Sequence, residues 1–152
     1  MFEKYFVTCN VAILLKNVGY DEPCIAVYDC NKVDAEHRID YGNHPFQPHR
    51  NSKLQPWLYA APLYQQVFEW LESKGLYLHP YKVPLLNEQP AYYGVNIFND
   101  EGMHLWPDVP HDKDYHKNIQ KYYYYDKLIA WRHAIMAAIR LFKKHINEQR
   151  KT

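Results

Sequence analysis

The sequence predicts an α+β fold, with one antiparallel sheet of three to four strands and two to three helices packed on it. Apolar residues recur at helical spacing in three stretches, and runs with strand-like alternation lie together in the middle of the chain. The resulting order is helix, strand, helix, several hairpin-type strands and helix, which lacks the alternation that a parallel doubly wound sheet needs. The 152 residues fit a single globular domain over 1–152.

The first predicted helix occupies CNVAILLKNVG. Thr8 stands at the N-cap position and Gly19 just past the helix end. The apolar residues at helical spacing are Val11, Leu14, Leu15 and Val18. After Pro23 comes a β-prone run, CIAVYD. Its two predicted faces are Ile25 and Val27, against Cys24, Ala26 and Tyr28.

Residues 30–60 are predicted to form an irregular loop. Several prolines interrupt YGNHPFQPHRNSKLQPW, and each one pushes the residue before it out of the helical region. A short strand near 38–41 is compatible with this loop. Long loops inside a compact domain are often functional. The other irregular segment is the C-terminus at about 147–152, which is expected to fray.

The stretch AAPLYQQVFEWLESKG predicts the second helix. Pro62 suits its first turn, and Gly75 fits the position after its end. The apolar stripe consists of Leu63, Val67, Trp70 and Leu71. Gln65, Glu69 and Glu72 fall on the opposite side, so the stripe is expected to face the core.

Three strand predictions follow the second helix. LYLHPYKV contains Pro80, which indicates an edge strand or a bulge. AYYGVNIF has two alternating faces, Tyr93, Val95 and Ile97 against Tyr92, Gly94, Asn96 and Phe98. NDEG predicts a tight hairpin loop that leads into MHLW.

Four consecutive tyrosines, residues 122–125, stand before the last predicted helix. The apolar stripe of that helix is Leu128, Trp131, Ile135, Ala138, Ile139 and Phe142. A helix turns about 100° per residue, so four neighbours point to four sides and cannot line one site. If the helix extends over them, Tyr124 falls on the stripe and Tyr125 on the flank of Arg132. The run is therefore expected to cover the helix start and not to act in catalysis.

Charge is distributed unevenly along the chain, although the net charge is only +1. Residues 113–152 hold ten Lys/Arg and three Asp/Glu, a net +7, while residues 1–112 hold eight and fourteen, a net −6. The basic segment either contacts nucleic acid or docks on the acidic part of the chain. The candidate nucleic-acid face consists of Arg132, Arg140, Lys143, Lys144 and Arg150.

Catalytic signatures are not found. The chain has no glycine-rich phosphate loop, G-x-S-x-G elbow, HExxH pair or CxxC pair. Cys9, Cys24 and Cys30 lack metal spacing and are interpreted as reduced thiols that serve packing, although each is a conceivable nucleophile. The best metal candidate, His111 and His116 with the intervening aspartates, lacks a third partner and is read as solvated loop. We expect no cofactor, no metal and no catalysis.

No signal-peptide pattern and no membrane-length apolar run is present. The expectation is a cytoplasmic protein that does not enter a membrane.

Three stretches carry a resemblance to a known family. They are LLKNVGYDEPC at 14–24, RNSKL with YAAPLYQQVFEWL at 50–71, and HAIMAAIRLFKKHI at 133–146. In this order they resemble motifs of an uncharacterised family of small proteins from phages, prophages and mobile elements in gut bacteria of the Bacteroides group. The resemblance implies architecture and genetic context but no activity. HDKDYHKNIQKYYYY departs from the family pattern.

These observations favour a non-enzymatic accessory protein that acts through protein–protein interaction. Aromatics form 16% of the chain, and amphipathic aromatic rings are typical of interfaces. The candidate surface is Tyr122, Tyr123 and Tyr125 with His44, Phe46, His49 and Trp57 from the long loop. Its partner is another protein or a second copy, because Ile129 and Met136 lie off the core stripe. Nucleic acid is the alternative partner.

Overall fold

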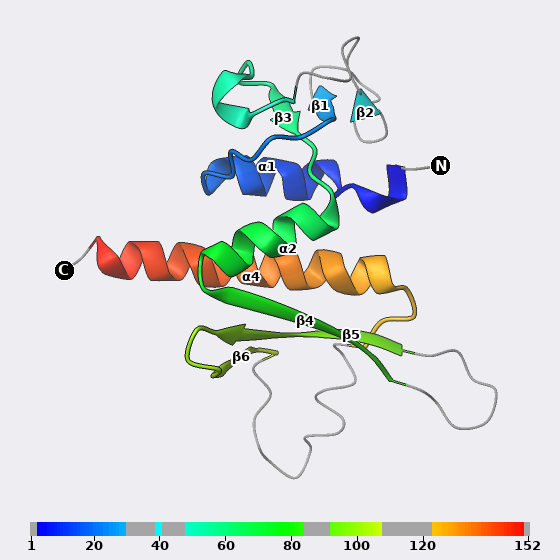
Figure 1. Cartoon of the computed structure of the whole chain (residues 1–152), viewed down its shortest axis with the longest axis vertical. Coiled ribbons are helices and arrows are strands. Elements are labelled where there is room, and N and C mark those ends of the chain that lie inside the picture. The colour runs from blue at the N-terminus through cyan, green and yellow to red at the C-terminus, as the bar shows by residue number, and fades with distance from the viewer. Residues whose placement is uncertain (1–2, 30–38, 41–47, 84–91, 108–122, 151–152) are drawn as a thin grey trace. The chain divides into compact units, whose positions relative to one another are not determined.

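The computed structural model describes residues 3–29, 39–40, 48–83, 92–107 and 123–150 (Figure 1). They form two compact units, each described by itself here: Met1–Trp70 with Lys143–Thr152, and Leu71–Phe142. Helices and antiparallel sheets make up both, which confirms the α+β class. The predicted single sheet is wrong, because two three-stranded sheets are present and the strands of each pair within one unit.

The first unit contains the sheet β2-β1-β3. Its described elements are η1 (Glu3–Tyr5), α1 (Cys9–Asn17), β1 (Val27–Asp29), β2 (Ile39–Asp40), η2 (Asn51–Lys53), β3 (Leu58–Ala60) and the greater part of α2 (Tyr64–Ser73). The short strand expected near 38–41 is present as β2. The region predicted as irregular also contains η2 and β3. The local sequence did not indicate β3, because this strand is held by antiparallel pairing with β1.

The end of α1 follows the sequence prediction. Gly19 has φ 87°, the left-handed conformation that glycine adopts without steric cost. The amide of Tyr20 donates to the carbonyl of Leu15 (3.0 Å) and that of Gly19 to the carbonyl of Lys16 (3.1 Å), which is the Schellman pattern. Thr8 occupies the N-cap position, but its side chain makes no capping hydrogen bond.

The predicted faces of CIAVYD require a correction. Cys24, Ala26, Val27 and Tyr28 are all buried, whereas Ile25 is 54% exposed. The strand begins only at Val27, because the backbone of Cys24 pairs instead with His49 in an isolated bridge, with N–O distances of 2.8 and 2.7 Å. Alternation therefore does not extend back to Ile25.

Helix α2 begins at Tyr64, two residues later than Pro62 suggested. Leu63 forms a bridge with Phe6, and the carbonyl of Pro62 accepts from the amide of Val7 (3.0 Å), so this segment is extended. The predicted stripe is otherwise confirmed, since Val67, Trp70 and Leu71 are buried and Gln65, Glu69 and Glu72 are exposed.

The second unit consists of an antiparallel sheet and a helix. Its elements are β4 (Leu76–Val83), β5 (Tyr92–Asn99), β6 (His104–Trp106) and the part of α4 (Lys127–Gln149) up to Phe142. The order β4-β5-β6 puts the proline-containing β4 at an edge, as Pro80 predicted. The β5–β6 turn has Gly102 at φ 76°, and the Asn99 side chain accepts from the amide of Met103 (2.8 Å).

Helix α4 packs on one side of this sheet through small side chains. Ala130 and Ala134 form a buried cluster with Val95 of β5. The partly buried residues around them are Leu78, Tyr93, Trp106, Tyr124 and Trp131. In Figure 1 the orange part of α4 lies along the β4–β5 hairpin. Alanine lets a helix backbone come close to a sheet, so a face that appears weakly apolar in the sequence is buried.

Tyr123, Tyr124 and Tyr125 are not part of α4, which begins at Lys127. The carboxylate of Asp126 accepts from the amide of Leu128 (2.7 Å) and so caps the helix start. Just before it, the backbones of Tyr124 and Tyr93 exchange hydrogen bonds of 2.7 and 2.9 Å. The helical placement considered for Tyr124 and Tyr125 therefore does not apply, although Tyr124 does pack against the core cluster.

Candidate interaction surface

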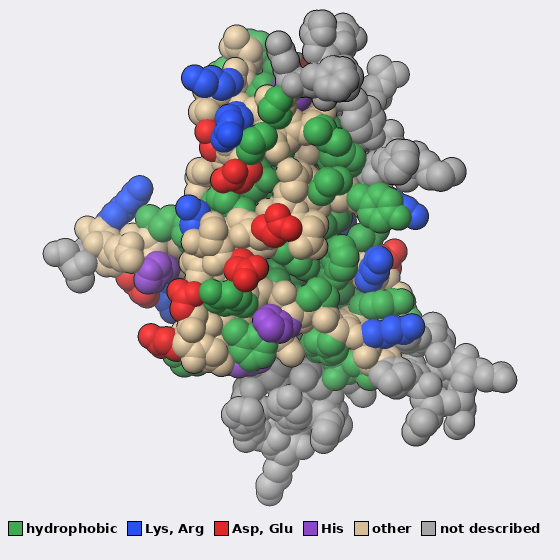
Figure 2. All heavy atoms as spheres, viewed as in Figure 1, with side chains coloured by type: hydrophobic (Ala, Val, Ile, Leu, Met, Phe, Trp, Pro, Cys, Tyr) green, Lys and Arg blue, Asp and Glu red, His purple; other side chains and the backbone are tan. Residues whose placement is uncertain are grey.

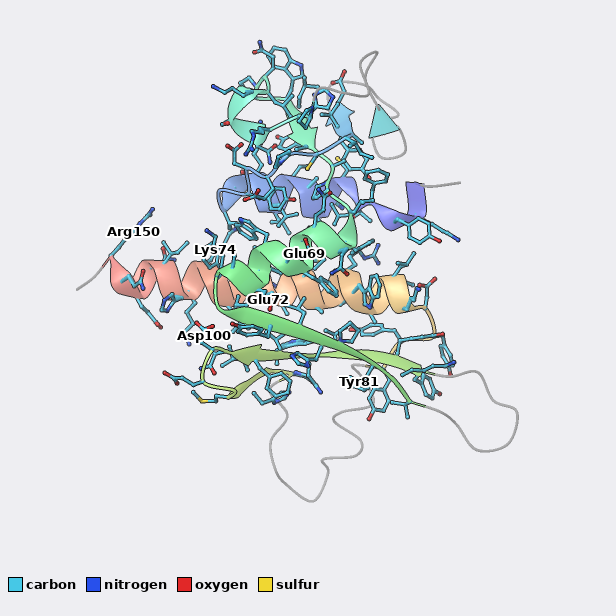
Figure 3. The ribbon with its side chains drawn as sticks, in the orientation of Figure 1. Glu69, Glu72, Lys74, Tyr81, Asp100 and Arg150 are labelled. Atoms are coloured by element: carbon cyan, nitrogen blue, oxygen red, sulfur yellow. The ribbon has the colours of Figure 1, made fainter. Side chains whose placement is uncertain are left out.

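The sheet side that faces away from α4 is lined with aromatic side chains. Strand register places Tyr77 opposite Phe98 and Tyr81 opposite Gly94, on the side of the sheet that Val95 does not share. Figure 3 shows Tyr81 pointing away from α4. We call this surface the tyrosine face and define it as Tyr77, His79, Tyr81, Tyr92, Asn96, Phe98, His104, Tyr123 and Tyr125.

At one end of the tyrosine face, Phe98 lies between two histidines. Its ring centroid is 5.2 Å from that of His79 and 5.3 Å from that of His104. Both histidines are exposed. Beside them the Tyr77 hydroxyl donates to the Asp100 carboxylate (2.8 Å), which raises the pKa of Tyr77. Figure 2 shows histidine among hydrophobic side chains over this sheet.

Four tyrosines contact one another at the other end. The rings of Tyr92 and Tyr123 are stacked at 6.0 Å, and Tyr81 meets Tyr123 edge-on at 6.4 Å. Tyr125 lies 4.6 Å from Tyr92, ring to ring, and their hydroxyl oxygens are 2.8 Å apart. This hydrogen bond raises the pKa of Tyr92. Tyr125 is 65% exposed, so the cluster is open to solvent.

Gly94 makes room for the ring of Tyr81. A Cβ added to Gly94 would lie 2.8 Å from Tyr81 Cε2, closer than van der Waals contact allows. Gly94→Ala is therefore expected to displace this ring and to lower the free energy of unfolding by about 1–2 kcal/mol. Urea denaturation of Gly94→Ala, Tyr81→Ala and the double variant measures the coupling between the two sites. If the double variant lost as much free energy of unfolding as the two single variants together, the contact between Gly94 and the Tyr81 ring would be contradicted.

The described residues that the sequence grouped into one surface belong to two different units. Tyr123 and Tyr125 belong to the tyrosine face. His49 and the 43% exposed Trp57 belong to the first unit. Within the described residues, His49 Nε2 is buried and has no hydrogen-bond partner. The remaining predicted members, Tyr122, His44 and Phe46, lie outside the described residues, as do His111, His116 and Cys30.

Sequence reasoning missed most of the tyrosine face because it followed the apolar half of each strand. The unused signal was the opposite half of AYYGVNIF, where Tyr92 and Phe98 occupy positions that are usually polar in a one-sided sheet. Tyr77 and Tyr81 alternate in the same way along β4.

Two of the stretches that carry the family resemblance contact each other in the first unit. The Asp21 carboxylate accepts from the backbone amide and from the hydroxyl of Ser52, each at 2.7 Å, and these bonds lower the pKa of Asp21. The buried Asn51 side chain donates to the Tyr20 carbonyl (2.8 Å) and accepts from the Ala60 amide (3.0 Å). These motif residues therefore serve to join segments distant in the sequence.

The thiol of Cys24 lies inside the first unit, fully buried. Its Sγ lies 3.4 Å from the Glu22 carbonyl oxygen, and burial raises its pKa to about 11. A thiolate is the reactive form, so Cys24 of the native protein is expected to resist iodoacetamide at neutral pH and to react once urea unfolds the chain. Peptide mass spectrometry checks this; full alkylation of Cys24 in native protein would contradict it.

Basic side chains occupy the exposed side of α4. Arg140, Lys143, Lys144 and Arg150 are exposed, and Arg132 is half-buried. Partial burial and the charges of Arg132 and Arg140 lower the pKa of His133. Near them Ile129 is 40% exposed and Met136 is half-buried.

Within the described ranges, no three His, Cys, Asp or Glu side chains converge as a metal site would require. Likewise, none of the described helices has the length and apolar character to span a membrane.

No protein-family model matches the chain, and no curated protein or solved structure shows significant similarity to it.

Proposed function

We propose that this chain is a non-enzymatic accessory protein that binds another protein, and that the tyrosine face is its main contact surface. The observation that carries the proposal is the outward side of a three-stranded sheet, where two groups of contacting rings lie at the two ends. Rings of this kind supply large contact area at small cost in conformational entropy, and tyrosine is enriched at interfaces and in their hot spots.

The exposed Trp57 of the first unit is a second proposed contact. The order of family-like motifs supports an origin in a phage or mobile element. A cytoplasmic location is part of the proposal, and the free, buried thiol of Cys24 supports it, because reduced cysteines are typical of that compartment.

Site-specific photo-crosslinking tests the contact surface. His104, replaced by the crosslinker p-benzoylphenylalanine, is expected to capture a protein from lysate of the producing cells, and nuclease treatment should not remove it. The same crosslinker at the exposed Glu69 of α2 serves as the control. Tyr125→Glu should abolish capture at position 104. Equal capture at both positions, or capture unaffected by Tyr125→Glu, would overturn the proposal.

Nucleic-acid binding is the second candidate, and the solvent exposure of Arg140, Lys143, Lys144 and Arg150 favours it. Filter binding over a salt series is decisive, because each phosphate contact adds about 0.9 to the slope of log affinity against log salt on duplex DNA. The double variant Lys143→Glu, Lys144→Glu should flatten that slope. A flat slope for the parent protein would reject this candidate.

A further inference from the structure

Part of the tyrosine face is lined with contacting aromatic rings. The ring of Tyr81 lies directly over Gly94, where even a methyl group would collide with it. Tyr123 meets it edge-on, and Tyr92 stacks on Tyr123. A partner at this place therefore meets aromatic rings set on the sheet itself, and not long flexible side chains. Little side-chain entropy is lost when such rings are covered.

The same part of the face offers hydrogen-bond donors. Tyr92 and Tyr125 share one hydrogen bond between two hydroxyl groups, so only one of the two hydroxyl hydrogens is used by it. Among the described residues no acceptor is found for the other hydroxyl hydrogen, so a partner can accept a hydrogen bond from it. Tyr125 is exposed enough to present it outward.

Charge distinguishes this face from a nucleic-acid site. None of its nine residues is a lysine or an arginine. Lys82 of β4 is opposite Tyr93, on the side of the sheet that packs against α4. The charged neighbours at the β5–β6 turn are acidic, Asp100 and the exposed Glu101. Phosphate groups would meet no arginine or lysine of the face and would be repelled at that end.

A proline-rich chain has the complementary chemistry. Proline has a carbonyl acceptor but no backbone N–H, so such a segment needs donors and apolar ring surface from its partner. Its polyproline II conformation is largely formed before binding, which reduces the entropy lost on docking. Grooves that recognise such segments are lined with aromatic side chains.

We propose that the tyrosine face binds an extended, proline-rich segment of a partner protein, with proline rings on Tyr81 and Tyr92 and a backbone carbonyl accepting from the Tyr92–Tyr125 pair. This inference rests on the proposed function and specifies the class of partner.

Fluorescence anisotropy with a labelled oligoproline peptide tests it. Saturable binding is expected, and a glycine–serine peptide of equal length should not bind. Tyr81→Ala and Tyr125→Ala should each weaken binding about tenfold or more, as loss of an interface hot spot does. Tyr125→Phe keeps the ring and should weaken binding less. Tyr5→Ala, which removes an exposed aromatic ring from the first unit outside any proposed contact, should leave binding unchanged. Thermal melts confirm that each variant is folded.

Absence of saturable oligoproline binding, or equal binding by folded Tyr81→Ala and Tyr125→Ala, would overturn the inference. Preferential binding of oligothymidine to this face would overturn it as well. If oligoproline fails while crosslinking from position 104 still captures a protein in a Tyr125-dependent way, the partner class is wrong and the proposed function stands. If that crosslinking also disappears, both are wrong.

Discussion

Trp70→Ala is expected to lower the free energy of unfolding by about 3–5 kcal/mol, the range for removing a large aromatic side chain from a core. Trp70 is only 6% exposed in the first unit. Its ring meets that of Tyr20 edge-on, with centroids 5.3 Å apart. Tyr20 is fully buried, and burial raises the pKa of its hydroxyl far above the usual range. The alanine variant would leave a cavity beside a polar group that has little access to water.

Urea denaturation followed by circular dichroism measures the effect on Trp70→Ala. Trp57→Ala is the matched control, because Trp57 is 43% exposed and surface substitutions usually change stability by less than about 0.5 kcal/mol. A Trp70→Ala variant with the parent's denaturation midpoint would show that the buried face of α2 is assigned wrongly.

Asn51→Ala is expected to cost about 2–4 kcal/mol, although the side chain is small. The substitution removes a donor from the Tyr20 carbonyl and an acceptor from the Ala60 amide. Asn51 is 6% exposed, so the two backbone groups would lose their partner in a place with little access to water. Each unsatisfied buried group costs about 1–3 kcal/mol.

Ser52→Ala provides the comparison for Asn51→Ala. Its hydroxyl donates to Asp21 at an exposed position, so water replaces the lost bond and the cost should stay near 1 kcal/mol. Thermal unfolding of both variants ranks them. Equal losses would show that burial of Asn51 does not determine its contribution.

Local signals in the sequence predicted local structure. Gly19, Gly75 and Gly102 all adopt positive φ at the ends or turns where sequence reasoning expected a chain reversal. The alternation of AYYGVNIF correctly put Val95 and Ile97 on one side of the strand, and both are buried. These features depend on backbone conformation and side-chain period within about ten residues, which a single sequence displays.

Features that depend on distant pairing were not predictable in this way. β3 exists because it pairs with β1, and Tyr124 leaves the helix because its backbone pairs with Tyr93. Neither partner is marked in the local sequence. The close approach of α4 to the sheet depends on Ala130 and Ala134, whose small size gives a weak apolar signal. Most of the tyrosine face was missed for a related reason, because only the apolar positions of its strands were used for the prediction.

The division of the chain into units affects how it is synthesised. The second unit, Leu71–Phe142, is inserted between the two parts of the first, Met1–Trp70 and Lys143–Thr152. Because a chain is synthesised from its N-terminal to its C-terminal end, every residue of the second unit is delivered before the final segment of the first. Domains tend to fold as units during synthesis. The unit whose translation begins earliest is thus the last for which the complete polypeptide becomes available.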